Sequence, residues 1–398
     1  DVLPAGGDAV GYIPSRRWDA SAAGAAGSHG AFVADAQLFD SAFFGVSPAE
    51  THAMDPQQRL LLEFGYTALH AVRERRESLR AADVGIFLGI MNADFSTLRL
   101  QIQSVYAATG GTISIAAGRL SFVLGTLGPC GSYDTACSSA LVALHSAASA
   151  MGASECAKAL TVAVSLMLSP QTHEVYARAG MLSTDGRCKT FDARANGYAR
   201  GEGVGAVTLC DPLAVEGVRL LGSRVRADGK SASLTAPNGT AQARMIGAAL
   251  AAAGGARLSL VEAHGTGTPL GDPTEAGGLE RALGAVGPCV RGVKANVGHT
   301  EPVAGLAGLL ALVHSSAQGA SGVNAKLRAL NPLLSDALQR LGARLPAQGL
   351  RLQVEFAAGV SSFGYSGTIA HAVLLRRGVR EQADLNFHSM AVRSPLEY

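Results

Sequence analysis

Short apolar runs alternate with Ala- and Leu-rich segments of helical length along most of the chain. The run at 83–90, DVGIFLGI, has the length and the β-branched content of a buried strand. Strands that alternate with helices favour a largely parallel sheet covered on both faces, which is the α/β class. The expected strands are 83–90, 160–168, 205–209, 258–262, 290–295 and 372–375, and the expected helices are 57–76, 138–151, 241–253 and 302–315.

The alternation is interrupted at Asp211-Pro212 and then starts again. One hydrophobic core stops growing at roughly 250–300 residues, and this chain has 398. We therefore predict two α/β halves, 1–212 and 213–378. A polar tail or linker without periodicity follows at 379–398.

The composition excludes several classes of protein. Hydrophobic residues make up 48% of the chain and charged residues 16%, which indicates a packed protein and not a disordered one. Lys and Arg total 33 against 31 Asp and Glu, and a formal charge of +2 gives no basic footprint for nucleic acid. The best apolar run, 303–313, is too short to span a membrane.

Cysteine usage indicates a reducing, intracellular compartment, either the cytoplasm or an organelle. The six cysteines form no CxxC pair, and their sparse spacing favours free thiols over a disulfide framework. The start, DVLP, has neither an initiator Met nor a signal sequence, so we expect the chain to begin inside a longer polypeptide. The cysteines are Cys130, Cys137, Cys156, Cys188, Cys210 and Cys289.

One of these cysteines stands in a chemically distinctive position. Cys137 lies in the stretch DTACSSAL, between a Gly-rich approach and an Ala/Leu helix. The unpaired amides and the positive dipole end of a helix start favour thiolate over thiol, so we expect the pKa of Cys137 to be lowered. The other five cysteines are expected to be inert core residues.

Two histidines follow predicted strands. His264 lies in EAHGTGTPLGDP, and His299 lies in KANVGHTE. The ligand crevice of an α/β sheet forms at the carboxyl ends of its strands, so the two imidazoles could converge on one thiolate. We expect Lys294 and Glu301 to form a buried pair that orients the loop of His299.

Three further patterns bear on cofactors and on oxyanion binding. The glycine-rich stretch GVSSFGYSGT at 359–368 is able to present backbone amides to an oxyanion. The stretch at 201–206 fits a dinucleotide-binding pattern, but a strand follows it where that motif needs a helix. His264, Asp272 and Glu275 lack regular metal-ligand spacing. We therefore expect neither a nucleotide nor a metal.

At these residues the chain resembles a β-ketoacyl synthase, the condensing domain of modular type I polyketide synthases in the thiolase-like superfamily. The resemblance implies a duplicated five-layer αβαβα fold and a homodimer. It also implies acyl carrier protein partners that deliver a phosphopantetheine arm, with no cofactor bound by the domain itself. Besides the stretches above, the matching blocks are MDPQQRLLLE at 54–63, RAGMLS at 178–183, GRCKTFD at 186–192 and LTAPNG at 234–239.

The resemblance implies a role for each catalytic candidate. Cys137 matches the acyl-accepting nucleophile, whose thioester splits one carbon–carbon bond formation into two easier steps. His264 and His299 match the two histidines whose N–H groups would stabilise the enolate formed when CO2 leaves a malonyl thioester. Lys294 and Glu301 match the supporting pair.

The resemblance also implies binding residues. Thr266 and Thr268 fall where the family hydrogen-bonds the phosphopantetheine arm. Phe363 falls where a gating aromatic donates its backbone N–H to the oxyanion hole, beside the N–H of Cys137.

Three features depart from the family pattern. The family begins with an apolar strand and a Gly-Met-x-Cys-Arg-Phe-Pro segment, and neither precedes the matching stretch from residue 8. Either the polypeptide is truncated here or the first half lacks a strand. Gly118 and Ile369 each replace a usual Asn. We expect Ile369 to reduce the rigidity of the site, and Gly118, together with a further departure at 224–228, to affect the substrate preference.

The leading hypothesis is decarboxylative Claisen condensation of a Cys-bound acyl chain with malonyl carrier protein in polyketide biosynthesis. A non-elongating, acyl-transferring ketosynthase is an alternative, although such domains typically lose a catalytic His. A fatty-acid-type ketoacyl synthase shares the same core chemistry. A non-catalytic chain-length or scaffolding partner would replace the nucleophile, and Cys137 is present.

Overall fold

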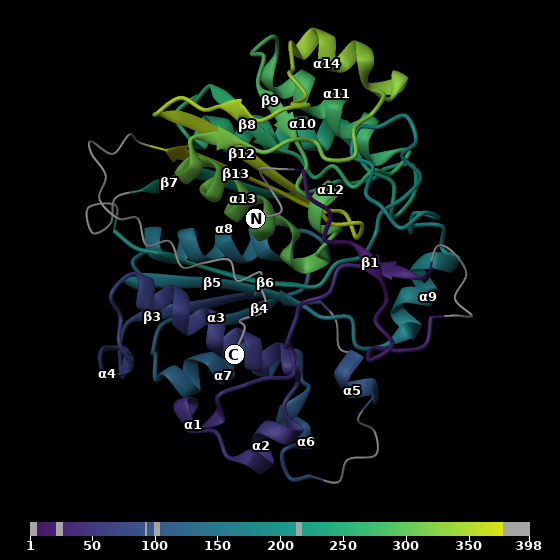
Figure 1. Ribbon diagram of the computed structural model, residues 1–398. Coiled ribbons are helices and arrows are strands. Elements are labelled where there is room, and N and C mark those ends of the chain that lie inside the picture. Colours follow the sequence, from purple (N-terminus) through teal and green to yellow (C-terminus); the bar gives the residue numbers. More distant parts are fainter. Residues whose placement is uncertain (1–5, 21–26, 92–93, 99–103, 212–216, 377–398) are drawn as a thin grey trace.

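Two β-sheets and the helices that cover them form five layers in this computed structural model (Figure 1). The structure describes residues 6–20, 27–91, 94–98, 104–211 and 217–376, so the predicted tail at 379–398 lies outside the described residues. Helices α8 and α13 lie between the sheets, α3 and α7 cover one outer face, and α10, α11 and α14 cover the other. The predicted five-layer αβαβα class is confirmed. The helices that form these layers are α3 (Pro56–Ala71), α7 (Ile113–Leu124), α8 (Ser139–Gly152), α10 (Gly239–Ala252), α11 (Gly271–Leu283), α13 (Ala304–Gln318) and α14 (Ser335–Leu341).

The first sheet has the strand order β4-β3-β5-β6. Strand β3 pairs in parallel with β4 and β5, and β6 runs antiparallel to β5 at the edge. The bounds are β3 (Val84–Gly89), β4 (Cys130–Tyr133), β5 (Lys158–Ser165) and β6 (Gly203–Leu209).

The second sheet repeats this plan with one more strand, in the order β9-β8-β12-β13-β7. Strand β8 is parallel to β9 and β12, β13 is antiparallel to β12, and β7 is antiparallel to β13. Among the described residues β7 has no counterpart beyond β6 in the first sheet. The bounds are β7 (Val218–Ala227), β8 (Leu258–Glu262), β9 (Cys289–Arg291), β12 (Phe356–Phe363) and β13 (Thr368–Arg376).

The shorter elements make the loops and the rim. They include α12, which occupies part of the expected strand 290–295 and starts the loop that carries His299. These elements are β1 (Gly11–Tyr12), β2 (His29–Gly30), α1 (Ser41–Phe44), α2 (Pro48–Ala53), α4 (Arg76–Leu79), α5 (Asp94–Leu98), α6 (Ala107–Gly110), α9 (Pro170–Arg178), α12 (Lys294–Val297), β10 (Ala320–Ser321) and β11 (Leu350–Arg351).

The sequence pattern located most of the longer elements but not the sheet directions. The expected strand 258–262 is correct, and 83–90, 160–168 and 205–209 agree within a few residues. The prediction of largely parallel sheets is wrong on one side of each sheet, because β6, β13 and β7 are paired antiparallel. Strands β4, β7 and β12 were not predicted, since their Gly, Ser and Arg content hides the alternation.

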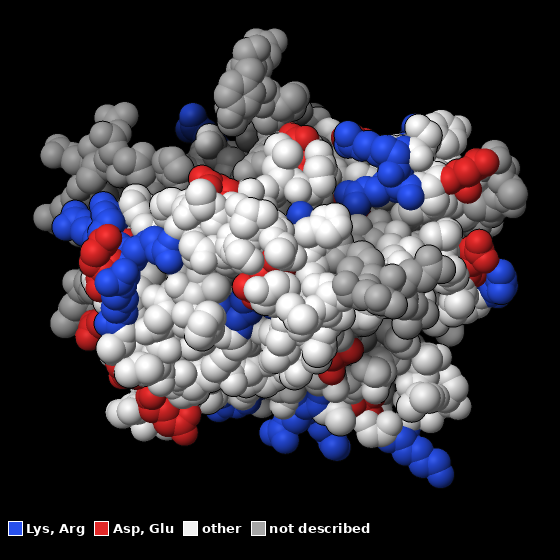
Figure 2. Space-filling model, turned by 90° about the horizontal axis from the view of Figure 1, so that it is seen from below, with Lys and Arg blue, Asp and Glu red and all other residues white. Residues whose placement is uncertain are grey.

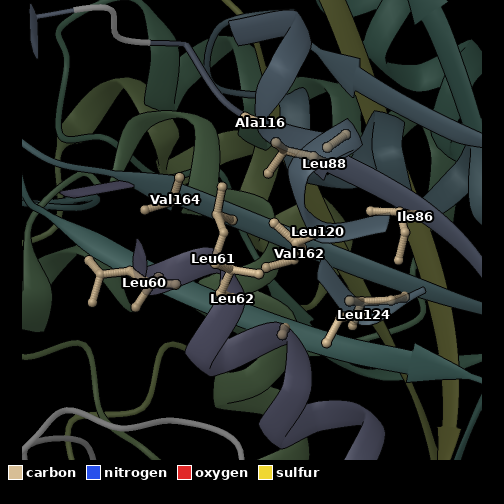
Figure 3. Close-up of a cluster of buried hydrophobic side chains, with 14 of the residues drawn as sticks. Leu60, Leu61, Leu62, Ile86, Leu88, Ala116, Leu120, Leu124, Val162 and Val164 are labelled. Atoms are coloured by element: carbon tan, nitrogen blue, oxygen red, sulfur yellow. The ribbon is translucent and has the colours of Figure 1, made fainter. Parts of the chain in front are cut away.

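The first core lies between α3, α7 and the inner sheet strands (Figure 3). Helix α3 starts cleanly because the Asp55 side chain accepts the N–H of Gln57 and Pro56 occupies the first turn. Three consecutive leucines on α3 are buried, which anchors the helix to the sheet. The labelled side chains of Figure 3 are Leu60, Leu61, Leu62, Ile86, Leu88, Ala116, Leu120, Leu124, Val162 and Val164.

The charged surface agrees with the balanced composition. On the face seen from below, Lys and Arg stand in separate small groups with Asp and Glu near them (Figure 2). No helix of the described residues combines the length and the apolar character that a bilayer crossing requires.

Gly89 tests how closely β3 and α8 approach, and Gly118 on α7 serves as a control. A Cβ added to Gly89 would lie 2.8 Å from the backbone N of Ala140, whereas one added to Gly118, exposed on α7, would meet nothing within 4 Å. We expect Gly89→Ala to lower the free energy of unfolding by about 1–3 kcal/mol. The control, Gly118→Ala, should raise it by about 0.5–1 kcal/mol. Urea unfolding measures both, and an unchanged Gly89→Ala would contradict the close approach.

Candidate active site

Cys137 stands in a tight turn between β4 and α8. Ala136 has a left-handed backbone, with φ of 55°, so the chain reverses just before the sulfur and the helix begins two residues after it. The Ser139 hydroxyl donates to the carbonyl of Ala136 at 2.6 Å and accepts the N–H of Thr135 at 2.9 Å. These bonds hold a strained turn that a non-glycine residue adopts only with support.

Two histidines from the second half of the chain lie against this turn. The Nε2 atom of His299 is 3.0 Å from Sγ of Cys137, and the rings of His264 and His299 stand nearly perpendicular with centroids 5.5 Å apart. One side-chain nitrogen of each histidine and the sulfur all lie within 4.8 Å of one another. The predicted convergence of both imidazoles on the thiol is what the structure shows.

Backbone amides decide which imidazole nitrogen carries the proton. The N–H of Glu301 donates to Nδ1 of His299, and the N–H of Phe363 donates to Nδ1 of His264, both at 3.3 Å. An Nδ1 that accepts has a lone pair, so the proton of each neutral ring is on Nε2. His299 therefore points its Nε2–H at the sulfur of Cys137, and His264 also carries its proton on Nε2.

Burial keeps both histidines neutral. It lowers the pKa of His264 and of His299 well below the usual value of 6.5, and the positive charge of Lys294 lowers both further. Neutral rings with Nε2–H groups stay donors across the neutral pH range.

Burial also overturns the prediction of a lowered thiol pKa. It raises the pKa of Cys137 to about 12, and the negative charge of Glu301 acts in the same direction. Lys294 opposes this, as do the backbone N–H groups of Cys137 and Tyr365, which hydrogen-bond the sulfur. Desolvation of a side chain that is only 8% exposed outweighs the field of the helix start. The resting group is a thiol.

The backbone N–H of Phe363, expected in the oxyanion hole, donates instead to Nδ1 of His264. The second amide at the sulfur is that of Tyr365. Strand β12 ends at Phe363, and that register directs the Phe363 N–H to His264. The turn that follows brings the Tyr365 amide to the sulfur instead. The Phe363 ring still lies beside the site, 5.4 Å from the His264 ring. The sequence Phe-Gly-Tyr offered two aromatic candidates, and only the strand register separates them.

The expected Lys294–Glu301 pair also needs correction. Both carboxylate oxygens of Glu301 accept from Arg200, at 2.5 and 2.9 Å. Lys294 is buried on α12, and the carboxylates that act most strongly on its pKa are Glu262 and Glu275. The sequence reasoning missed Arg200, although an arginine within the small-residue stretch 199–206 was a usable signal.

Two buried carboxylates brace the loop of His264. Glu275 accepts the backbone N–H of His264 at 2.7 Å and that of Gly265 at 2.8 Å. Asp272 accepts the N–H of Phe191 at 2.8 Å and that of Gly267 at 3.0 Å. Both acids therefore act as loop anchors, and the sequence pattern had offered them only as metal candidates.

The cluster of Cys137, His264 and His299 has a spacing that a metal ion could use. A metal would need the lone pair of Nε2, which moves the ring proton to Nδ1. There it would face the backbone N–H of Glu301 or Phe363. The donor set therefore fits proton-bearing imidazoles better than metal ligands.

The two threonines of the same loop form a hydroxyl pair. The Oγ1 atoms of Thr266 and Thr268 are 3.2 Å apart, and Oγ1 of Thr268 also accepts the N–H of Gly271. Thr266 is buried and Thr268 is half-buried.

Comparison with known proteins decides the family. The model of the β-ketoacyl synthase N-terminal domain matches residues 1–212, and that of the C-terminal domain matches residues 218–325. The chain belongs to the β-ketoacyl synthase family. The predicted family and the predicted enzyme class, an acyltransferase, are therefore confirmed.

Relatives of this ketosynthase include much longer proteins. It is 40% identical to the phenolphthiocerol synthesis polyketide synthase type I Pks15/1 of Mycobacterium bovis, over 94% of this chain and 19% of that protein. It is 39% identical to erythronolide synthase EryA3 of Saccharopolyspora erythraea, over 94% of this chain and 13% of that protein. The chain thus spans less than a fifth of these relatives.

A solved structure gives the same result. The ketosynthase from module 6 of the bacillaene synthase of Bacillus subtilis superposes with a TM-score of 0.87 at 31% identity, covering 95% of this chain and 68% of that chain. The match supports the ketosynthase fold over nearly the whole length.

The raised thiol pKa predicts how Cys137 reacts with iodoacetamide. Only the thiolate is alkylated, so with a pKa of about 12 the rate should rise about tenfold per pH unit from pH 7 to pH 10 without a plateau. Peptide mapping by mass spectrometry separates Cys137 from exposed Cys130. A plateau below pH 8 would show instead that the helix start dominates over burial.

Proposed function

We propose that the chain catalyses decarboxylative Claisen condensation of an acyl chain on Cys137 with malonyl carrier protein, in polyketide biosynthesis. The observation that carries this proposal is the convergence of two imidazoles, each protonated on Nε2, on one thiol, with a nitrogen of each ring and the sulfur within 4.8 Å of one another. Two neutral N–H donors suit a developing enolate oxygen, and the thiol suits an acyl acceptor.

The first half-reaction loads the enzyme. The sulfur of Cys137 attacks the carbonyl of the acyl carrier thioester. The amides of Cys137 and Tyr365, which hydrogen-bond the sulfur at rest, would donate to the oxyanion that forms next to it. The carrier thiolate leaves and takes up the proton that the Cys137 thiol gives up. The product is an acyl-Cys137 thioester and a free carrier thiol.

The second half-reaction extends the chain. Malonyl carrier protein loses CO2, and the Nε2–H groups of His264 and His299 stabilise the enolate oxygen. The enolate carbon attacks the acyl carbonyl, and the sulfur of Cys137 leaves and is protonated. The β-ketoacyl product stays on the carrier.

The proposal includes partners. Acyl carrier protein would supply both thioesters, with its phosphopantetheine arm beside the hydroxyl pair of Thr266 and Thr268. Neighbouring polyketide synthase domains are supported by the length of the relatives. We also propose an intracellular setting, since the six cysteines are free. A fatty-acid product would use the same residues, and product analysis separates the two.

Two variants separate loading from decarboxylation. We expect Cys137→Ala to abolish acyl loading, and His299→Ala to load normally but to release CO2 more slowly, on the order of 100-fold or more, as for loss of an oxyanion donor. Lys294→Ala should likewise load the acyl group normally and release CO2 more slowly. A single-turnover assay follows acylation and CO2 separately.

Three results would contradict this assignment. If peptide mapping finds the acyl group on another cysteine, Cys137 is not the nucleophile. If the His299→Ala variant releases CO2 from malonyl carrier protein at the normal rate, His299 does not act in decarboxylation. Loading without any CO2 release in the unmodified protein would favour a non-elongating ketosynthase.

The family resemblance and the edge of β4, which pairs with no further strand among the described residues, support a homodimer. We expect light scattering to give about twice the chain mass of 40.5 kDa. A monodisperse monomer at micromolar concentration would contradict the dimer.

A further inference from the structure

We propose that Arg200 is a positioning residue that keeps the proton of His299 on Nε2, by holding the backbone amide of Glu301 against Nδ1. The kinetic consequence rests on the proposed function, because the Nε2–H group is the donor to the enolate. The structural consequence, the tautomer of His299, does not depend on any substrate.

The Glu301 backbone adopts a conformation that requires support. Its φ of 50° is left-handed, which a non-glycine residue adopts at a cost of roughly 1–3 kcal/mol. This conformation aims the Glu301 N–H at Nδ1 of His299, 3.3 Å away. If the backbone relaxed, Nδ1 would lose its donor and nothing at that atom would favour the Nε2–H tautomer.

The side chain of Arg200 supplies the support. Its Nε and Nη2 atoms donate to the two carboxylate oxygens of Glu301, and the side chains are 0% and 2% exposed. A planar guanidinium that binds both oxygens fixes direction as well as distance. The carboxylate, and with it the Glu301 backbone, is thus held in one orientation.

The backbone around Arg200 holds His299 itself. The N–H of His299 donates to the carbonyl of Ala199 at 2.7 Å, and the N–H of Gly201 donates to the carbonyl of His299 at 2.8 Å. The segment 199–201 therefore fixes both sides of the His299 main chain while the Arg200 side chain fixes Glu301 two residues later. The neighbours of Arg200 in the chain therefore hold His299, and the Arg200 side chain holds the residue that donates to its Nδ1.

Stability alone explains this arginine poorly. A buried ion pair is often no more stabilising than an apolar pair of similar volume. Arg200 also has a buried nitrogen, Nη1, with no hydrogen-bond partner in the described part of the chain, and its guanidinium rests on the ring of Tyr176 at 5.2 Å. An unsatisfied buried donor is destabilising, which favours a role in the geometry of the site.

The test reads the tautomer directly. Nitrogen-15 NMR of protein labelled at histidine, with the His299 signals assigned by their loss in His299→Gln, should show only the Nε2–H form. In Arg200→Met we expect a mixture with the Nδ1–H form and CO2 release from malonyl carrier protein slower by roughly 10- to 100-fold. Acyl loading of Cys137 should stay within about twofold, because the amides at the sulfur remain.

Matched variants separate positioning from folding. Arg178→Met removes an arginine whose partner is Glu174 on the surface and should leave both readouts unchanged. Arg200→Lys keeps the charge but not the fork and should fall between Arg200→Met and the unmodified protein. If Arg200→Met does not fold, the double variant Arg200→Met/Glu301→Leu replaces the ion pair with apolar side chains and should show the same mixture.

A pure Nε2–H signal for His299 in Arg200→Met or in the double variant would overturn the proposal. So would an equal loss of acyl loading and CO2 release, which marks a general structural defect. If the unmodified protein releases no CO2, the proposed function fails while the NMR result still decides the role of Arg200.

Discussion

Two hydrogen bonds from the main chain determine what this site can do. The amides of Glu301 and Phe363 each donate to an imidazole Nδ1, and this places both ring protons on Nε2. The Nε2 atom of His299 lies 3.0 Å from the sulfur of Cys137. If Nδ1 of either ring carried the proton instead, Nε2 of that ring would become an acceptor. The left-handed backbone at Glu301 positions one of these amides, and the end of β12 at Phe363 positions the other.

Desolvation sets the charge state around those bonds. Burial lowers the pKa of both histidines and raises that of Cys137, so the resting centre is uncharged at its reacting atoms although Lys294 and Glu301 lie close by. In a neutral, dry site, fixed N–H donors stabilise the negative charge that develops in the transition state. They need no reorganisation when that charge appears. The nearby charged residues act at a distance on the three reacting groups.

The duplicated fold explains how distant parts of the sequence meet. The nucleophile follows β4 of the first sheet, and the two histidines follow β8 and β9 of the second sheet. Helices α8 and α13, packed between the sheets, connect the halves so closely that a Cβ on Gly305 would lie 2.4 Å from Cγ of Leu141. Both sheets therefore direct their strand ends into one centre.

The sequence by itself determined the α/β class, the positions of most of the longer helices and the identities of Cys137, His264 and His299. It could do so because periodicity and local motifs are properties of neighbouring residues. The tertiary structure decided the antiparallel strand pairings, the thiol pKa, the Tyr365 amide and the partnership of Arg200 with Glu301. Each of these depends on burial or on strand register between segments far apart in the chain, such as the 101 residues that separate Arg200 from Glu301. No local pattern encodes such a distance.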